Sequence, residues 1–464
     1  MTVILRKKIN KFGLVSTAGL TLVLFLCGGL AETGFADELS GPSEKTLTLK
    51  EALDLALHRN PNVKVSLKNY ESIRAQEGQV RSGYYPQLEA DLSYTRSTSN
   101  YAPQPGLGST PGSPGLESDA TYPFYSASLS VKQLLFDFGK LNTQTRSANM
   151  MTRSSVEDLK TSESQVALNV KQAYYGLLQS LQMAKVQQET VQQMEEHLRQ
   201  AEGFFQAGSK PKFDVTKARV DFTNARLSLI TAENNVQVAR VILNNAIGLP
   251  VDSVVLPADS LNFDNKEPIS LADASRIALE QRPELTSVRF KKASGLSNLE
   301  NAKQQYYPTL SASGGYAYRN EDFPLVYNWN IGATLTFPFF SGFQTRYQVD
   351  QFQANYESYS YQEEVAVQTV LLEVRQAYLN ILAGIQQIKT AQLVVQQAEE
   401  NLDLAKGRYS AGVGAPIEIT DAVVSHSNAR TSLVQALYNY NAAFAQFEKA
   451  TGKEMAALPS IEGK

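Results

Sequence analysis

The sequence predicts a mainly α-helical chain with membrane β-strands, in which a unit of long coiled-coil hairpins and paired strands occurs twice. Three observations lead to this fold class. Two parts of the chain align with each other, two long proline-free stretches carry seven-residue apolar repeats, and four short segments alternate apolar and polar residues.

The chain opens with a basic segment, an apolar stretch over Leu14–Leu30 and small residues up to Ala36. This layout is typical of a secretory signal peptide. We expect cleavage after Ala36, with Ala31 as the second choice, and an uncleaved anchor stays an alternative because the stretch nearly reaches spanning length. Lipidation at Cys27, the only cysteine, is disfavoured because the bulky Leu26 precedes it. No later apolar run reaches about 18 residues, so any membrane crossing must use β-strands.

An internal repeat organises the rest of the chain. Leu49–Pro86 aligns without gaps with Leu271–Pro308, and the later parts of the two copies align at a different offset. The offset changes at Ser97–Ala120, a Pro/Gly/Ser-rich segment that is longer than its counterpart, Arg319–Leu325. We therefore expect a signal peptide over 1–36, a first repeat over 46–250, a linker over 251–267, a second repeat over 268–452 and a C-terminal tail over 453–464.

Each copy is predicted to begin with two short helices. Thr48 precedes Glu51 by three residues, and Ser270 precedes Asp273 in the same way, which is a capping pattern at a helix start. Asn60 followed by proline then favours a second helix in the first copy.

The stretch Lys140–Gln206 contains no proline and predicts one helix of roughly 100 Å. Apolar residues recur along it, and along its counterpart, every seven positions, which forces a left-handed supercoil. The glycine-containing breaks after each long helix are expected to be tight reversals into another helix. A soluble filamentous coiled coil would explain these helices equally well. The repeated positions are Val170, Leu177, Ala184, Val191, Leu198 and Phe205, then Val374, Ile381, Ile388, Val395, Leu402 and Tyr409, with a small-residue seam at Val370, Ala377, Gly384, Ala391, Ala398 and Ala405.

The segments between the helices distinguish a membrane protein from a soluble coiled coil. They alternate apolar and polar residues with a period of two and carry aromatic residues near their ends. Apolar strand residues outside, polar residues inside and aromatic rims are what a transmembrane barrel requires. Four strands cannot close a barrel, since the smallest have about eight, so the chain must oligomerise to span a membrane. The residues expected to face lipid include Leu88, Leu92, Trp329, Ile331 and Leu335.

The duplicated plan resembles the TolC-like outer-membrane factor family. The match rests on Tyr-Tyr-Pro before a strand, Leu135–Gly139 and Phe340–Gly342 after the returning strands, and the paired Ala-Gly reversals. The resemblance implies a trimer whose four strands per chain make a twelve-stranded barrel in the outer membrane, continued by a helical tunnel into the periplasm. It further implies an exit duct for efflux or type I secretion, which works with a periplasmic membrane-fusion adaptor and an inner-membrane pump of the RND, ABC or MFS class.

The same resemblance places two functional regions. Glu418 and Asp421 match the acids that ring the periplasmic entrance of the family, where Tyr409 would take part in a closing contact. The family's closing arginine is replaced by Gly414. Glu418 also has a simpler interpretation, because an acid in a first helical turn is favoured by the macrodipole. The reversals that would dock an adaptor are Gly208, Ser209, Gly412 and Val413.

The sequence offers no enzyme-like constellation, and we expect neither a catalytic activity nor a cofactor or metal. His58, His197 and His426 fall on three different predicted helices without metal-ligand spacing, so we expect them to lie on the protein surface. Nucleic acid is not expected as a partner, because the net charge is -3 and no basic stripe appears. The main alternative function is a periplasmic coiled-coil adaptor or interaction protein, whose strands would lack a lipid-facing apolar band.

Overall fold

The computed structural model describes residues 45–98, 121–263, 265 and 268–452, which belong to one compact unit, Glu44–Lys464. The expected signal peptide with Cys27, most of the long loop Ser97–Ala120 and the C-terminal tail lie outside the described residues. No helix among the described residues combines the length and the apolar character needed to cross a bilayer.

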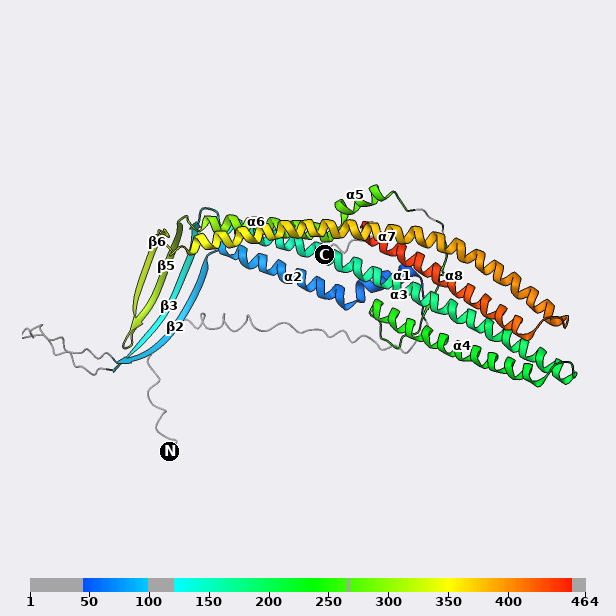
Figure 1. The fold of residues 1–464 in the computed structure, drawn as a ribbon. Coiled ribbons are helices and arrows are strands. Elements are labelled where there is room, and N and C mark those ends of the chain that lie inside the picture. Colours follow the sequence, from blue (N-terminus) through cyan, green and yellow to red (C-terminus); the bar gives the residue numbers. More distant parts are fainter. Residues whose placement is uncertain (1–44, 99–120, 264, 266–267, 453–464) are drawn as a thin grey trace, which may run out of the picture. The chain divides into compact units, whose positions relative to one another are not determined.

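The two copies of the repeat have the same order of elements, so the predicted two-fold repeat and the mixture of long helices with four strands are confirmed (Figure 1). The long helices α3 and α7 have 67 residues each, and the helices that follow them, α4 and α8, have 36 each. The helices are α1 (Leu49–Arg59), α2 (Pro61–Arg81), α3 (Lys140–Gln206), α4 (Lys212–Ile247), α5 (Leu271–Gln281), α6 (Pro283–Gln304), α7 (Gln344–Ser410) and α8 (Pro416–Thr451), with a 3-10 turn at Ser82–Tyr84.

The capping patterns form as the sequence predicts. The Thr48 hydroxyl accepts a hydrogen bond from the Glu51 amide at 3.3 Å, and the Glu51 carboxylate accepts one from the Thr48 amide at 2.8 Å. In the second copy the Ser270 hydroxyl accepts from the Asp273 amide at 3.1 Å. These bonds satisfy amide groups that a helix start leaves without partners.

Four antiparallel strands form one sheet in the order β2-β3-β5-β6, and the short strands β1 (Lys45–Leu47) and β4 (Val255–Pro257) form a separate parallel pair. Among the described residues, β2 and β6 are therefore the two unpaired edges of the long sheet. Its strands are β2 (Gln87–Thr98), β3 (Thr121–Phe136), β5 (Thr309–Asn320) and β6 (Val326–Thr336).

The register joins the apolar positions of all four strands into one face. Residues that lie directly opposite each other in an antiparallel ladder project from the same side of the sheet. Leu88 lies opposite Val131, Val131 opposite Gly314, and Gly314 opposite Ile331. The neighbouring apolar row runs through Ala90, Leu129, Tyr316 and Trp329.

The junction between the sheet and α3 contains a register shift and a side-chain cap. A shift between Leu134 and Phe136 restores Phe136 to the apolar face, where it lies opposite Leu310. Just beyond, the Asp137 carboxylate accepts hydrogen bonds from the Gly139 and Leu141 amides at 3.0 and 2.6 Å. Asp137 therefore supplies the partners that the start of α3 requires.

Within the helical part, α3 packs against α4 and α8, and α7 packs against α8, which gives the lateral order α4-α3-α8-α7. Val374, Ile381 and Ile388 of the predicted seam are fully buried. Helix α7 comes very close to α8 at Gly384, where an added Cβ would lie 3.3 Å from the Cα of Tyr440.

The predicted seam of the first copy is wrong at its end, because Phe205 is 44% exposed. The buried positions of α3 shift there to Thr190, Met194, His197 and Ala201. A straight helix drifts relative to a seven-residue repeat, and α3 has to cover both α4 and α8. Its buried stripe therefore departs from a single heptad row.

Candidate functional sites

The two hairpin tips have the same backbone geometry. Gly208 and Gly412 have φ values of 74° and 77°, which side chains with a Cβ rarely adopt. The Ser209 amide donates to the Phe204 carbonyl at 3.0 Å, and the Val413 amide donates to the Arg408 carbonyl at 3.1 Å. These are the long bonds of a Schellman helix end, so the reversals occur where the sequence predicts them.

The tips are open to solvent. Val413 is 69% exposed, and an added Cβ at either positive-φ glycine would meet nothing within 4 Å. Their proposed role in docking an adaptor stays a prediction.

Glu418 makes two contacts at the start of α8. Its carboxylate accepts a hydrogen bond from the Arg408 Nε at 3.0 Å and one from the Ala415 amide at 3.2 Å. The Arg408 hydrogen bond first, and the Ala415 amide second, hold the pKa of Glu418 below its ordinary value. Glu418 thus accepts an amide hydrogen bond at the start of α8, and it is also paired with an arginine that sequence reasoning missed.

Asp421, one helical turn further, is exposed. Its spacing from Glu418 places the two acids on neighbouring positions of one helix surface. An entrance role for this pair stays a prediction.

Gly414 has a physical reason to lack a side chain. An added Cβ would lie 2.8 Å from the Tyr409 amide nitrogen and 3.0 Å from the Arg408 carbonyl carbon. Both neighbours are backbone atoms that cannot move away cheaply. The close approach of the backbone therefore excludes an arginine at position 414, and a guanidinium reaches Glu418 from position 408 instead.

Tyr409 lies in the interior, with no exposed surface. Its ring centroid is 5.2 Å from that of His197 and 5.4 Å from that of Phe204, both in edge-on arrangements. Burial first, and the charge of Asp214 second, raise the pKa of Tyr409. Its hydroxyl has no hydrogen-bond partner within the described part of the chain.

The expectation of surface histidines is wrong for two of the three. His197 is 3% exposed and His426 is 8% exposed, on α3 and α8 respectively. Each helix is covered by a neighbour from the other copy, which the sequence pattern of a single helix does not reveal. Within the described residues no group of three or more His, Cys, Asp or Glu side chains is arranged to hold a metal ion.

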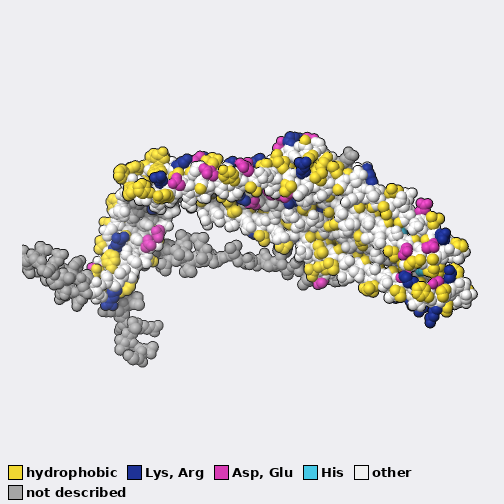
Figure 2. Space-filling view, in the orientation of Figure 1, with side chains coloured by type: hydrophobic (Ala, Val, Ile, Leu, Met, Phe, Trp, Pro, Cys, Tyr) yellow, Lys and Arg dark blue, Asp and Glu magenta, His cyan; other side chains and the backbone are white. Residues whose placement is uncertain are grey.

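The residues predicted to face lipid are all exposed in the single chain. Their exposed fractions are large for apolar side chains, and Figure 2 shows hydrophobic side chains gathered where the strands meet α6 and α7. An exposed apolar sheet face of this kind marks a surface that another phase or partner covers. The values are 68% for Leu88, 88% for Leu92, 68% for Trp329, 80% for Ile331 and 63% for Leu335.

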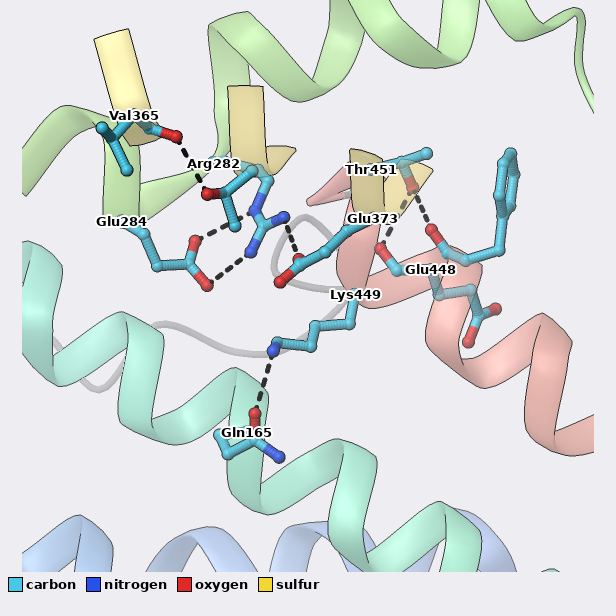
Figure 3. Close-up of polar contacts among 10 residues, drawn as sticks. Gln165, Arg282, Glu284, Val365, Glu373, Glu448, Lys449 and Thr451 are labelled. Atoms are coloured by element: carbon cyan, nitrogen blue, oxygen red, sulfur yellow. Dashed lines mark hydrogen bonds and ion pairs between the residues drawn. The ribbon is translucent and has the colours of Figure 1, made fainter. Parts of the chain in front are cut away.

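A separate charged cluster lies where α6 begins. Arg282, 4% exposed, lies between Glu284 and Glu373, while Lys449 of α8 donates to Gln165 of α3 at 2.9 Å (Figure 3). Each acid is exposed by less than a third, and the two pairs join the start of α6 to α7. The role that best explains this cluster is structural, because its ion pairs hold helices together.

Comparison with known proteins identifies the family. A model of the family described as "Outer membrane efflux protein" matches residues 52–249 and 274–453. Outer membrane protein TolC of Escherichia coli is 25% identical over 433 residues, covering 89% of this chain and 82% of the relative. Alkaline protease secretion protein AprF of Pseudomonas aeruginosa is 22% identical over 417 residues, covering 88% and 84%.

Solved structures show the same fold. The outer-membrane channel OprN superposes with a TM-score of 0.76 at 17% identity, covering 87% of this chain and 89% of that one. The Campylobacter jejuni CmeC outer membrane channel superposes with a TM-score of 0.74 at 21% identity, covering 87% and 85%. Because the family match covers most of the chain and both copies of its repeat, this protein belongs to the outer membrane efflux protein family.

Proposed function

We propose that three copies of this chain form an outer-membrane exit duct, which passes substrates from an inner-membrane pump through the periplasm to the exterior. The observation that carries the proposal is the four-stranded sheet, with one continuous apolar face and two edges that no other described segment pairs. Unpaired backbone groups are not tolerated in lipid. Pairing β6 of one copy with β2 of the next, three times, would make a closed barrel of twelve strands.

The helical part supports the same assembly, because its lateral order ends in α4 and α7, each of which has only one of the other three long helices as a close neighbour. Each carries exposed apolar side chains spaced by seven and then fourteen residues, which places them on one side of the helix as in a coiled-coil seam. In the proposed ring, α4 of one copy would pack against α7 of the next. The exposed residues are Val220, Leu227 and Val241 on α4, and Leu372, Leu379 and Leu393 on α7.

The partners are proposed by analogy with the family. TolC is named as an outer membrane protein and AprF as an alkaline protease secretion protein. By analogy, the tips at Gly208 and Gly412 would meet a periplasmic adaptor, and an RND, ABC or MFS pump would supply the energy. The repeat boundaries predicted from the sequence, with a cleaved signal peptide over residues 1–36, are part of the same proposal.

The decisive experiment is fractionation of the exported protein. We expect it in the outer membrane, as a detergent-resistant trimer that heating converts to monomers. A water-soluble monomer would contradict the proposal and would favour a periplasmic adaptor. Crosslinking followed by affinity capture then tests the partners, and recovery of an inner-membrane pump with its adaptor is the expected result.

A further inference from the structure

His197 is an unusual buried group near the hairpin tips. It lies on α3 with 3% of its surface exposed, and its Nδ1 has no hydrogen-bond partner within the described residues. Its ring packs edge-on against Tyr409 of α7, with 5.2 Å between centroids. A buried nitrogen without a partner is costly, and a charged ring at the same place would cost more.

The surroundings of His197 join both hairpins. An apolar cluster takes residues from all four long helices and includes Tyr409 as a fully buried member. The cluster is therefore one of the contacts that join the α3–α4 hairpin to the α7–α8 hairpin near their tips. Its buried members are Met194 on α3, Ala225 on α4, Leu402, Ala405 and Tyr409 on α7, and Ile419, Ala422 and Val423 on α8.

The charged groups around His197 are unevenly distributed between the hairpins. On its own hairpin, α4 places Asp221, Asp214 and Lys217 close enough to influence it. From α7 it faces Tyr409, and α8 contributes Ile419 to the adjoining cavity and Arg430, which pairs with Glu189 of α3. The adjoining cavity of about 550 Å³ adds Glu189 and Glu196 from α3 and Lys406 from α7.

One of these acids also joins the two hairpins. The Asp221 carboxylate accepts a hydrogen bond from the Thr420 hydroxyl of α8 at 3.1 Å, and it pairs with Lys217 at 2.6 Å. Thr420 is buried. A cationic side chain that draws the Asp221 carboxylate away from Thr420 therefore removes a contact between the hairpins.

We propose that His197 is a proton-sensitive contact, whose protonation loosens the junction between the α3–α4 and α7–α8 hairpins near their tips. The imidazolium cannot remain against the apolar cluster, and the acids near it all lie on its own hairpin, Asp214 and Asp221 on α4 and Glu189 and Glu196 on α3. Movement toward these acids gives up the packing on Tyr409, and movement toward Asp221 also competes with Thr420 for that carboxylate. Both changes weaken contacts between the hairpins. The proposal goes beyond the duct function and does not depend on it.

The direction of the pH effect follows from burial. Burial lowers the pKa of His197 from its ordinary value of 6.5, Asp221 and Asp214 oppose that shift, and Lys217 adds to it. A group whose pKa is lowered in the packed state favours that state above its ordinary pKa. The joined hairpins are therefore fully stable above about pH 6.5 and become less stable as the pH falls below it.

A distance measurement tests this directly. Spin labels are placed on cysteines at Ser209→Cys and Val413→Cys in a full chain carrying Cys27→Ser, diluted so that each assembly holds one labelled chain. Pulsed EPR then records the distance between tips at about pH 7.5 and about pH 5.5. We expect a longer, broader distribution at the acidic pH. Identical distributions at the two values would overturn the proposal.

The variants assign the effect to one ring. His197→Gln and His197→Phe, checked for assembly, should keep the neutral-pH distribution at both pH values. The matched control is His426→Gln, because His426 is also buried but lies on α8, whereas the ring contact with Tyr409 belongs to His197 of α3. Retention of the acid shift in both His197 variants, or its loss in the His426 variant, would count against His197. An acid shift in a protein that fails to form trimers in the outer membrane would support the proton-sensitive contact and count against the duct.

Discussion

Arg282 donates two hydrogen bonds to the carboxylate of Glu284, from Nε at 3.1 Å and from Nη2 at 2.8 Å. The same guanidinium pairs with Glu373 of α7, so one side chain holds the start of α6 against that helix. Burial alone would raise the pKa of Glu284, but the hydrogen bonds and charge of Arg282 outweigh it and hold that pKa below 4.5. Arg282, Glu284 and Glu373 are therefore stable as buried or half-buried charges only while all three are present.

Removing this arginine should destabilise the helical part at neutral pH. We expect Arg282→Met to cost about 3 kcal/mol, the low end for a broken buried pair, because both acids are partly exposed to solvent. Because the pKa of Glu284 is lowered, its stabilising contribution is present above about pH 4.5 and is lost as the pH falls through the folded value. Denaturant unfolding at neutral pH and at a pH below 4.5 measures this change in the free energy of unfolding. Arg276→Met, in an exposed pair on α5, is the control and should cost under about 1 kcal/mol.

The register of β6 makes the lipid-facing prediction specific. Ile331→Arg or Leu335→Arg would place a charge on the apolar face, at a cost of roughly 2–4 kcal/mol near the bilayer midplane. The yield of trimers in the outer membrane should fall. Thr334→Arg is the matched control, because Thr334 lies opposite Ser311 on the polar face and should assemble normally. Equal losses for both faces would show that the assignment of faces is wrong.

The long loop of the first copy should be dispensable. Thr98 and Thr121, at its two ends, are paired through their hydroxyls at 2.9 Å, so the strand pairing around it is complete. The corresponding connection in the second copy needs only residues 321–325. Replacing residues 99–120 with that short sequence should preserve export, since surface loops tolerate such changes. Normal trimers without export would indicate a gating or receptor role.

The tip glycines should be intolerant of side chains for a conformational reason. Gly412→Val, at φ 77°, would cost about 1–2 kcal/mol or deform the reversal, and export should drop while trimers persist. Gly407→Val is the control, because Gly407 is helical and an added Cβ there meets nothing within 4 Å. Adaptor crosslinking from Ser209 and Val413 tests whether the tips are the docking site. Absence of crosslinks would leave the glycines as helix ends only.

The entrance acids should bind multivalent cations when three copies bring them together. Trivalent cations added to the periplasmic side of trimers in a bilayer should block conductance, and Glu418→Ala with Asp421→Ala should relieve the block. Arg408→Ala is informative in the opposite direction. This variant removes the guanidinium that pairs with Glu418, so the block by trivalent cations should become stronger. If the double variant is blocked as strongly as the unmodified protein, both acids are surface residues without an entrance role.

The parts of the fold with local causes could be predicted from the sequence. The capping box at Thr48, the reversals at Gly208 and Gly412, and the alternation along β6 depend on residues a few positions apart, so the pattern contains the cause. The repeat added the expectation that each feature occurs twice. The site residues lie at the hairpin tips and at the start of α8, as the sequence predicts, and their functional roles are predictions.

The features that sequence reasoning missed depend on neighbours distant in the chain. A heptad shows which side of α3 is apolar, but the burial of His197 depends on α7 and α8, which follow much later. Arg408 reaches Glu418 because Gly414 brings two backbone segments together, a contact with no periodic signal. The shift at Leu135 likewise follows from the pairing of β3 with β5.

The two unpaired edges of the sheet differ, since one is β2 and the other is β6. In the proposed ring each copy offers one edge to the copy before it and the other edge to the copy after it. A chain that is damaged at β6 alone can still occupy the β2 side of a partner and prevent the ring from closing. Genes encoding such variants should be dominant over the normal gene in the same cell, whereas variants that fail to fold at all should be recessive.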